Sequence, residues 1–277
     1  DGSRELLESL RESLQPAFST HFMRHTWLLE PRAGVRIELA LDRGWIEARG
    51  QRQTIREIEL ELLDGTVSDL FAVAAELQAS LPLHPAASSK AERAYRLLDD
   101  LPLTAVKALP VPTDAAMSSI EAFRLIALSC LNHLQYNEAG VCQSDEPEFV
   151  HQARVAIRRL RSAMRLWQSR LPENFVTRFD PLWQELANKL GETRNWDVFI
   201  AETLPALADA LPGRVEVERL SSHALRRCAN SRKASRSALK SVAYSRLLID
   251  FSAATQALPD DAAGSLAHFV PRCLNKR

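Results

Sequence analysis

The hydrophobic pattern changes its period near residue 65, and this change restricts the possible folds more than any other feature of the sequence. Between residues 35 and 62 apolar and polar residues alternate, interrupted at Asp42-Arg43-Gly44 and bounded by Asp64-Gly65. Such alternation predicts antiparallel strands with turns at those steps. After Gly65 the apolar residues recur at helical spacing. We therefore expect an α+β chain in which a β domain precedes an all-α helical bundle.

Three prolines between residues 101 and 114 mark the expected domain boundary. We assign residues 1–102 to the β domain, 103–113 to a linker and 114–277 to the helical domain. Turn residues Pro172, Gly191, Pro212 and Pro259 are expected to separate helices. The predicted helices are Met117–Asn137, Glu146–Ser169, Phe175–Leu190, Asp197–Ala210, Arg214–Val242 and Ser245–Ala257.

The net charge of zero hides an uneven distribution along the chain. Residues 1–102 contain 12 Lys and Arg against 17 Asp and Glu, whereas residues 151–240 contain 17 against 9. A basic segment of this kind indicates an anionic partner.

No apolar run is long enough to cross a bilayer, and the first ten residues are unlike a secretory signal. We therefore expect a cytoplasmic protein without a membrane partner.

The four cysteines show no metal-binding spacing. No CxxC pair occurs, and no histidine stands at zinc-ligand spacing from Cys130, Cys142, Cys228 or Cys273. This favours idle or buried thiols.

Three glutamates alternate along the last expected strand. Glu57, Glu59 and Glu61 share one face of it, about 7 Å apart. Enclosed carboxylates at this spacing repel each other and favour a hard divalent cation such as Mg²⁺. The alternative is the solvated face of a half-buried sheet, which commonly has the same pattern. Spacing alone favours that alternative.

Residues 20–97 resemble the second half of a CYTH domain, the family of triphosphate tunnel metalloenzymes. The resemblance implies a closed antiparallel barrel that holds a triphosphate on inward Lys and Arg. It also implies Mg²⁺ or Mn²⁺ on Glu57 and Glu59, with Glu61 extending the same face. The segments that carry it are Phe22-Met23-Arg24, residues 35–44, residues 57–62 and Ser89-Lys90-Ala91-Glu92-Arg93.

The ExExK strand with which this family opens is not found in the sequence. In the family that strand supplies the first metal ligands and a phosphate-binding lysine. We therefore expect a partial β-barrel with little triphosphatase activity. Mg-dependent inorganic triphosphatase, acting on tripolyphosphate, stays the alternative function for the full-length protein.

The segment from Val150 to Trp167 combines a basic and an apolar helix face. Its basic residues, here called the arginine column, fall within an arc of roughly 80°. No acidic residue interrupts the column, and like charges at i,i+4 are locally unfavourable. Guanidinium groups bind phosphate oxygens bidentately, so we predict a bound polyanion, against the alternative of a basic surface without a ligand. The column is His151, Arg154, Arg158, Arg161 and Arg165, and the apolar stripe is Ala153, Ile157, Leu160, Met164 and Trp167.

A second basic helix is expected between residues 221 and 242, facing the same groove. Lys189 and Arg194 add candidates near Asp197, where we expect a helix to begin and its backbone amides to favour anions. The basic residues of the second helix are Arg226, Lys233, Arg236 and Lys240, and its expected packing residues are Leu225, Cys228, Leu239 and Val242.

Residues 114–277 resemble the CHAD family, through the motif from His151 to Arg161 and the motif from Leu186 to Val198. The resemblance implies two pseudo-repeated helical halves around a basic channel that binds inorganic polyphosphate. Asn195 stands where the family usually has Asp, and a second basic helix is expected beyond Arg277, so the bundle is expected to lack its final helices. The phosphate contacts implied by the resemblance are His151, Arg154, Arg158, Arg159, Arg161 and Arg194.

The leading functional interpretation is therefore a cytoplasmic polyphosphate-binding protein, associated with polyphosphate granules. In the alternative, the helical domain tethers an inorganic triphosphatase to polyphosphate. Specific nucleic-acid binding is not expected, because the basic columns have few interleaved aromatic residues and no recognition helix or zinc module is evident.

Overall fold

The computed structural model describes residues 8–13, 15–100, 102–259 and 264–274. The chain forms two compact units, a β unit of Asp1–Gly65 with Ser88–Pro102 and a helical unit of Thr66–Ala87 with Leu103–Arg277. The sequence pattern predicted a single boundary, after residue 102. In the structure the chain crosses between the units three times, because Thr66–Ala87 packs with the helices.

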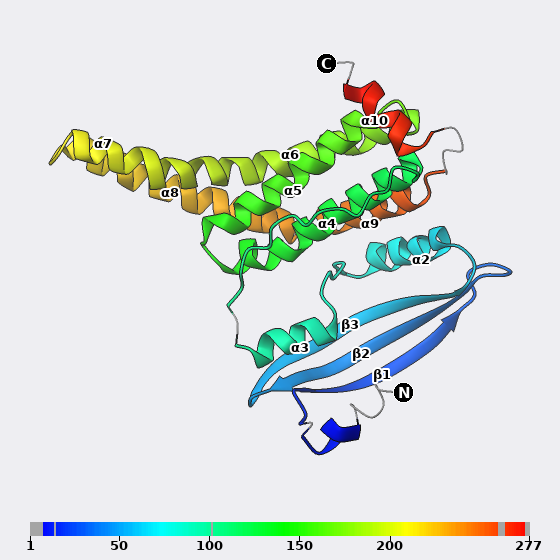
Figure 1. The fold of residues 1–277 in the computed structure, drawn as a ribbon. Coiled ribbons are helices and arrows are strands. Elements are labelled where there is room, and N and C mark those ends of the chain that lie inside the picture. The colour runs from blue at the N-terminus through cyan, green and yellow to red at the C-terminus, as the bar shows by residue number, and fades with distance from the viewer. Residues whose placement is uncertain (1–7, 14, 101, 260–263, 275–277) are drawn as a thin grey trace. The chain divides into compact units, whose positions relative to one another are not determined.

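The β unit contains a three-stranded antiparallel sheet (Figure 1). Strands β1 (Ser19–Leu29), β2 (Arg36–Ala48) and β3 (Gln51–Asp64) lie in that order, after a short 3₁₀ turn at Arg11–Ser13. Within the described residues the sheet is not closed into the expected barrel. Three strands leave β1 and β3 as edges, and closure needs more strands around the axis.

The turn expected at Asp42-Arg43-Gly44 is wrong, because β2 runs through these residues. The β2–β3 turn is formed by Arg49 and Gly50, both with positive φ, as two-residue hairpin turns prefer. A Cβ on Gly44 would lie 1.9 Å from the carbonyl oxygen of His21 in β1. This glycine therefore marks a close approach between strands and not a chain reversal.

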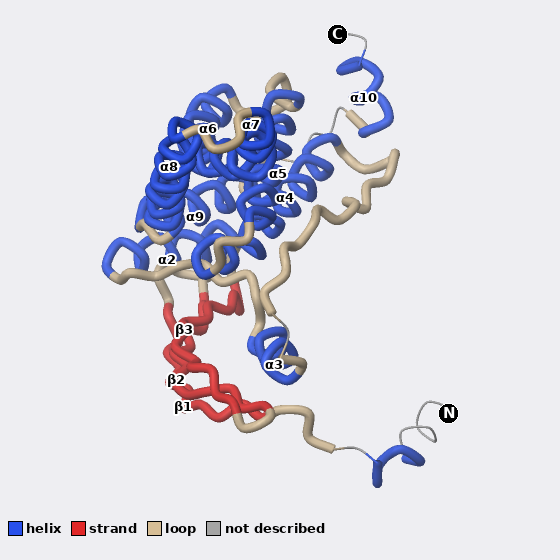
Figure 2. Tube along the Cα trace, turned by 90° about the vertical axis from the view of Figure 1, so that its left-hand side faces the viewer, coloured by secondary structure: helices blue, strands red, loops and turns tan. Residues whose placement is uncertain are grey.

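Helix α3 (Lys90–Leu98) covers one face of the sheet. Ser89 caps it, with a reciprocal hydrogen bond from the Ser89 backbone to Glu92. Ala94 packs on Ile46 and Ile55, and all three are almost fully buried. Side chains alternate along β3, so the face that carries Ile55 also carries Glu57 and Glu59. The glutamates therefore face α3, which lies beside the sheet in Figure 2.

The helical unit is built from long antiparallel helices (Figure 1). Helix α5 packs between α4 and α6, α6 packs on α8, and α2 packs on α9. No helix in the described part of the chain is long and apolar enough to span a membrane. The helices are α2 (Val67–Ser80), α4 (Ser119–Gln143), α5 (Pro147–Leu166), α6 (Glu173–Val198), α7 (Leu204–Ala210), α8 (Val215–Leu239), α9 (Val242–Gln256) and α10 (Leu266–Leu274), with a π-helical turn η2 at Phe199–Thr203.

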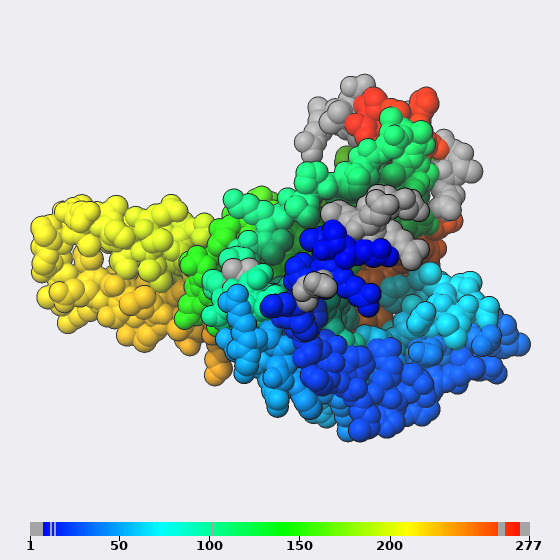
Figure 3. All heavy atoms as spheres, turned by 60° about the horizontal axis from the view of Figure 1, so that its bottom comes forward, coloured from blue at the N-terminus to red at the C-terminus, as the bar shows by residue number. Residues whose placement is uncertain are grey.

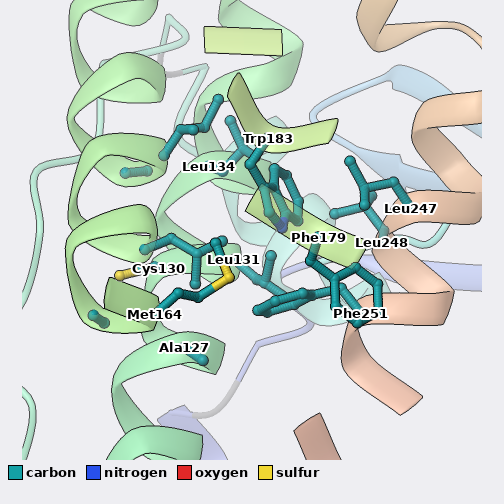
Figure 4. Packing of buried hydrophobic residues seen from close by; sticks show 14 of the residues in the cluster. Ala127, Cys130, Leu131, Leu134, Met164, Phe179, Trp183, Leu247, Leu248 and Phe251 are labelled. Carbon is teal, nitrogen blue, oxygen red and sulfur yellow. The ribbon is translucent and has the colours of Figure 1, made fainter. Parts of the chain in front are cut away.

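The core of the helical unit confirms the predicted apolar stripe of α5. Its five residues, Ala153 to Trp167, are all at most 4% exposed. Figure 4 shows Met164 of this stripe in the same cluster as Phe179 and Trp183 of α6 and Phe251 of α9. Burial of the stripe fixes the rotation of α5 about its axis and thereby the direction of the arginine column.

Two details of the expected helices are wrong. Gly191 lies inside α6, which continues through η2 into α7, so no helix begins at Asp197. Leu225 and Val242 are 54% and 59% exposed and do not pack as expected, although Cys228 and Leu239 are buried. The far ends of α6 and α8, joined by α7, reach beyond the other helices of this unit, as the yellow and orange atoms in Figure 3 show.

Candidate functional site

A groove of about 460 Å³ lies between α5 and α6, along the arginine column. Helix α5 supplies every residue of the column, and α6 supplies the opposite wall. The groove thus brings together six of the twelve predicted phosphate contacts. Its lining residues are His151, Arg154, Val155, Arg158, Arg161, Arg165, Gln184, Ala187, Asn188, Arg194, Asn195 and Val198.

Three guanidinium groups of the groove, here called the arginine triad, are not balanced by a carboxylate. Within the described residues no ion pair is formed by Arg154, Arg158 or Arg194. Burial lowers the pKa of Arg154, and the charges of Arg158 and Arg194 lower it further. A Cβ on Gly191 would lie 3.8 Å from Cζ of Arg154, so this side chain rests over the α6 backbone. The triad is therefore a concentration of positive charge in which Arg154 and Arg194 are half-buried and Arg158 is exposed.

The next arginine of the column is in a different state. Arg161 donates from Nε and Nη2 to the two carboxylate oxygens of Asp180 on α6, at 2.7 and 2.9 Å. The two side chains are 16% and 24% exposed. Arg165, one turn further on, is exposed and donates to the hydroxyl of Ser162. The basic residues of the column thus recur regularly in the sequence, but the charge of Arg161 is balanced by Asp180 whereas the charges of the triad are not balanced.

The other predicted phosphate contacts lie outside the groove. Lys189 pairs with Glu185 at 2.7 Å, on the neighbouring side of α6. Arg236 caps the end of α4 through the carbonyls of Val141 and Ser144 and pairs with Asp145. The remaining predicted contacts, which do not line the groove, are Arg159, Arg226, Lys233 and Lys240.

The second basic column therefore does not face the groove, contrary to expectation. Helix α8 instead contributes an ion pair, because Arg232 donates to the buried Asp197 of α6 at 2.5 Å. The side-chain amides of Gln184 and Asn188 also line the groove and were not among the predicted site residues. Their helical spacing with Arg194 is the only signal that could have indicated them.

The β unit holds a second cluster, of three carboxylates. Ligand oxygens of Asp42, Glu57 and Glu59 lie within 4.8 Å of one another. Asp42 is directly opposite Glu57 in the register of β2 and β3 and is fully buried. Glu61 is opposite Glu38 and is not part of the cluster. The structure thus groups two of the three predicted glutamates and adds an aspartate that was expected in a turn.

Three cations bind the same carboxylates. Lys90 of α3 contacts Asp42 at 2.7 Å, Glu59 at 2.5 Å and also Glu57. Arg24 donates to both oxygens of Asp42 at 2.7 Å and to Glu59 at 2.5 Å, and Arg93 pairs with Glu57.

These contacts favour the ionised forms of Asp42 and Glu59. The hydrogen bond from Arg24 lowers the pKa of Asp42 to about 2, helped by Lys90 and opposed by burial. The hydrogen bond from Lys90 similarly lowers the pKa of Glu59. An all-oxygen donor set of this kind fits Mg²⁺ or Mn²⁺. A divalent ion would have to compete with Lys90 for the same oxygens.

The fold and the groove together define a helical basic domain that follows a β domain. Residues 125–277, more than half of the chain, match the CHAD domain family, and residues 3–95 match the CYTH domain family. The chain belongs to the CHAD family, with a CYTH domain before its CHAD domain. The CYTH match includes Thr66–Ala87, although the structure packs this segment with the helical unit.

Two relatives agree with this assignment. Over 85 residues, 31% of this chain, the sequence is 44% identical to an inorganic triphosphatase of Haemophilus influenzae, and the match spans 24% of that protein's length. The crystal structure of the CHAD domain from the plant Ricinus communis superimposes with a TM-score of 0.53 and 32% identity. That superposition covers 62% of this chain and 57% of the plant chain.

Proposed function

We propose that the helical unit binds inorganic polyphosphate in the groove between α5 and α6. The observation that carries the proposal is the arginine triad, whose three guanidinium groups have no carboxylate partner within the described residues. A phosphate chain would supply the missing negative charge, and its oxygens accept paired hydrogen bonds from arginine. His151 and the amides of Gln184 and Asn188 would add donors along the same wall.

The groove favours a simple polyanion over nucleic acid. None of the residues that line it is Phe, Tyr or Trp, and single-stranded nucleic acids gain much of their affinity from stacking on such side chains. Phosphate contacts alone would remain for DNA or RNA. Binding of this kind would place the chain on polyphosphate granules in the cytoplasm.

A titration with two polymers tests this function. Long-chain polyphosphate and single-stranded DNA of equal total charge are added to the protein at one fixed ionic strength, and binding is followed by calorimetry. We expect the tighter complex with polyphosphate. Equal affinity for both polymers would contradict the proposal and would indicate nonspecific electrostatic binding of polyanions.

We propose as a second function that the β unit holds a divalent cation for an inorganic triphosphatase. The carboxylate cluster and the similarity to an inorganic triphosphatase favour it. Asp42, Glu57 and Glu59 would hold the ion, which when bound supplies charge neutralisation to phosphate oxygens. Lys90 and Arg24 would then be released from these carboxylates to contact tripolyphosphate.

Mn²⁺ binding, measured by calorimetry, separates the cluster from a general acidic surface. Glu59→Gln is expected to weaken Mn²⁺ binding, whereas the matched change Glu61→Gln, outside the cluster on the same strand, is expected to leave it unchanged. Equal effects of the two variants would overturn this assignment. Phosphate release from tripolyphosphate by this chain is expected to be small, because it has no ExExK motif.

A further inference from the structure

The groove between α5 and α6 has two electrostatically different parts. At one end the arginine triad is unbalanced, whereas Arg161 is bound bidentately by Asp180. Asp180 lies one helical turn before Gln184, which lines the groove. Asp180 does not itself line the groove, but it binds Arg161, which lies in the column between the triad and Arg165.

The Arg161–Asp180 ion pair changes the charge that an anion encounters along the groove. Bidentate arginine–carboxylate pairs are among the stronger hydrogen-bonded contacts, and this one is mostly shielded from solvent. A phosphate that approaches Arg161 must share its donors with Asp180 and meets a like charge. A phosphate at the triad meets neither obstacle. Affinity should consequently differ between the two parts.

The lengths of the two parts also differ. Arg154 and Arg158 are about 6 Å apart along the helix axis, whereas Arg154 and Arg165 are about 16 Å apart. A short anion such as tripolyphosphate can satisfy the triad without passing Arg161. A long chain that follows the groove must pass the Arg161–Asp180 pair.

We propose that Asp180 limits how much of the groove a polyphosphate chain occupies, and so sets the preference for chain length. The inference rests on the proposed polyphosphate binding and deepens it. The triad is the primary phosphate-binding site. Arg161 and Arg165 form an extension that a chain enters only when Arg161 leaves its carboxylate partner.

The test compares tripolyphosphate and long-chain polyphosphate on the same variants, by calorimetry at fixed ionic strength. Asp180→Asn keeps the side-chain shape and removes the charge. We expect it to tighten binding of the long chain by about two- to fivefold, the size of a freed ion pair, and to change tripolyphosphate affinity less than twofold.

A matched control separates this effect from net charge. Asp250 also pairs with an arginine, Arg178 of α6, at 3.1 Å, but Arg178, unlike Arg161, does not line the groove. Asp250→Asn makes the same change in net charge and should leave both affinities within twofold of wild type. Adding Arg161→Gln to Asp180→Asn should abolish the gain for the long chain. Circular dichroism checks that every variant is folded.

The outcomes distinguish this inference from the function on which it rests. Equal gains for both anions in Asp180→Asn, or no gain for the long chain, would overturn the role of Asp180 while polyphosphate binding stands. A gain of the same size in Asp250→Asn would also overturn it. If folded wild-type protein binds neither anion, the proposed function itself fails.

Discussion

Arginines of one helix face can have very different electrostatic surroundings. Arg154 is partly buried over the α6 backbone, Arg158 is exposed, and Arg161 is already bound to Asp180. Spacings of four and three residues place all three on one face of α5, so the difference comes from the residues that α6 places opposite them. A single helix therefore cannot show which of its cations are available to a ligand.

Reversing the charge of Arg158 should greatly weaken polyphosphate binding. Arg158→Glu removes a charge-assisted phosphate contact worth about 1.5–3 kcal/mol and adds repulsion. Arg226→Glu is the matched control, because Arg226 is an exposed arginine of α8 outside the groove. Titration at fixed ionic strength compares them, and equally large losses in both folded variants would show that no local site exists.

Acid should destabilise the β unit through Asp42. The pKa of Asp42 is about 2 in the fold and 3.8 without its partners. A depressed pKa contributes stability above the unfolded value, and this stability is lost as the pH falls through the folded value. We expect the free energy of unfolding to decrease between about pH 4 and pH 2. Denaturant unfolding at several pH values should show a weaker decrease in Asp42→Asn, and an unchanged pH dependence would contradict this role.

The arginine column could be predicted from the sequence because helical spacing alone puts its residues on one face. Asp42 and Asp180 could not be predicted in the same way. Asp42 reaches Glu57 through strand register, and Asp180 reaches Arg161 across a helix interface. Both contacts depend on tertiary packing, which local periodicity does not contain.

At the scale of the element, two glycines in the interiors of helices, Gly140 in α4 and Gly191 in α6, have different roles in packing. A Cβ on Gly140 in α4 would lie 2.0 Å from the ring of Phe149 in α5, whereas a Cβ on Gly191 would meet Arg154 at an ordinary 3.8 Å. Gly140 therefore permits α4 and α5 to approach closely. Gly191 leaves room for a methyl group.

This difference predicts opposite effects of alanine. Gly140→Ala should destabilise the helical unit by about 1–3 kcal/mol through overpacking. Gly191→Ala should be neutral or stabilising by up to about 1 kcal/mol, because alanine favours helix. Thermal unfolding followed by circular dichroism measures both. Adding Phe149→Leu should recover part of the loss in Gly140→Ala, and no recovery would contradict the steric explanation.

The sequence predicted the existence and type of the long helices better than their ends. Gly191 was expected to end a helix and Gly44 to form a turn, since glycine is common at both. In the structure Gly44 allows a close approach of β1, whereas Gly191 lies inside α6 and leaves room for a methyl group. The alternative roles of glycine are distinguished by what packs against it, and a single sequence does not show this.

At the scale of the whole molecule, the division into units differs from the boundary expected at the prolines after residue 101. Helix α2 packs on α9 and buries Val73, and Gln78 donates to the carbonyl of Val242 at 3.2 Å. His84 further contacts Ser245 and Glu138. The segment Thr66–Ala87 is thus part of the helical core although β strands precede it and α3 follows it.

Two fragments test this division. A fragment of residues 66–277 keeps α2, whereas a fragment of residues 103–277 removes it and exposes the surface of α9 that it covers. We expect the shorter fragment to have the lower Tm, since it loses buried apolar contacts. Equal melting temperatures of the two fragments would show that α2 contributes nothing to the stability of the helical unit.

The packing of α2 on α9 also has a consequence for synthesis on the ribosome. Gln78 and its partner Val242 are separated by 164 positions in the chain. At about 5–20 residues per second, Gln78 is translated roughly 8–33 s before Val242. During that interval the apolar face of α2 cannot pack on α9. Nascent chains stalled before residue 242 should therefore be the forms most readily bound by chaperones.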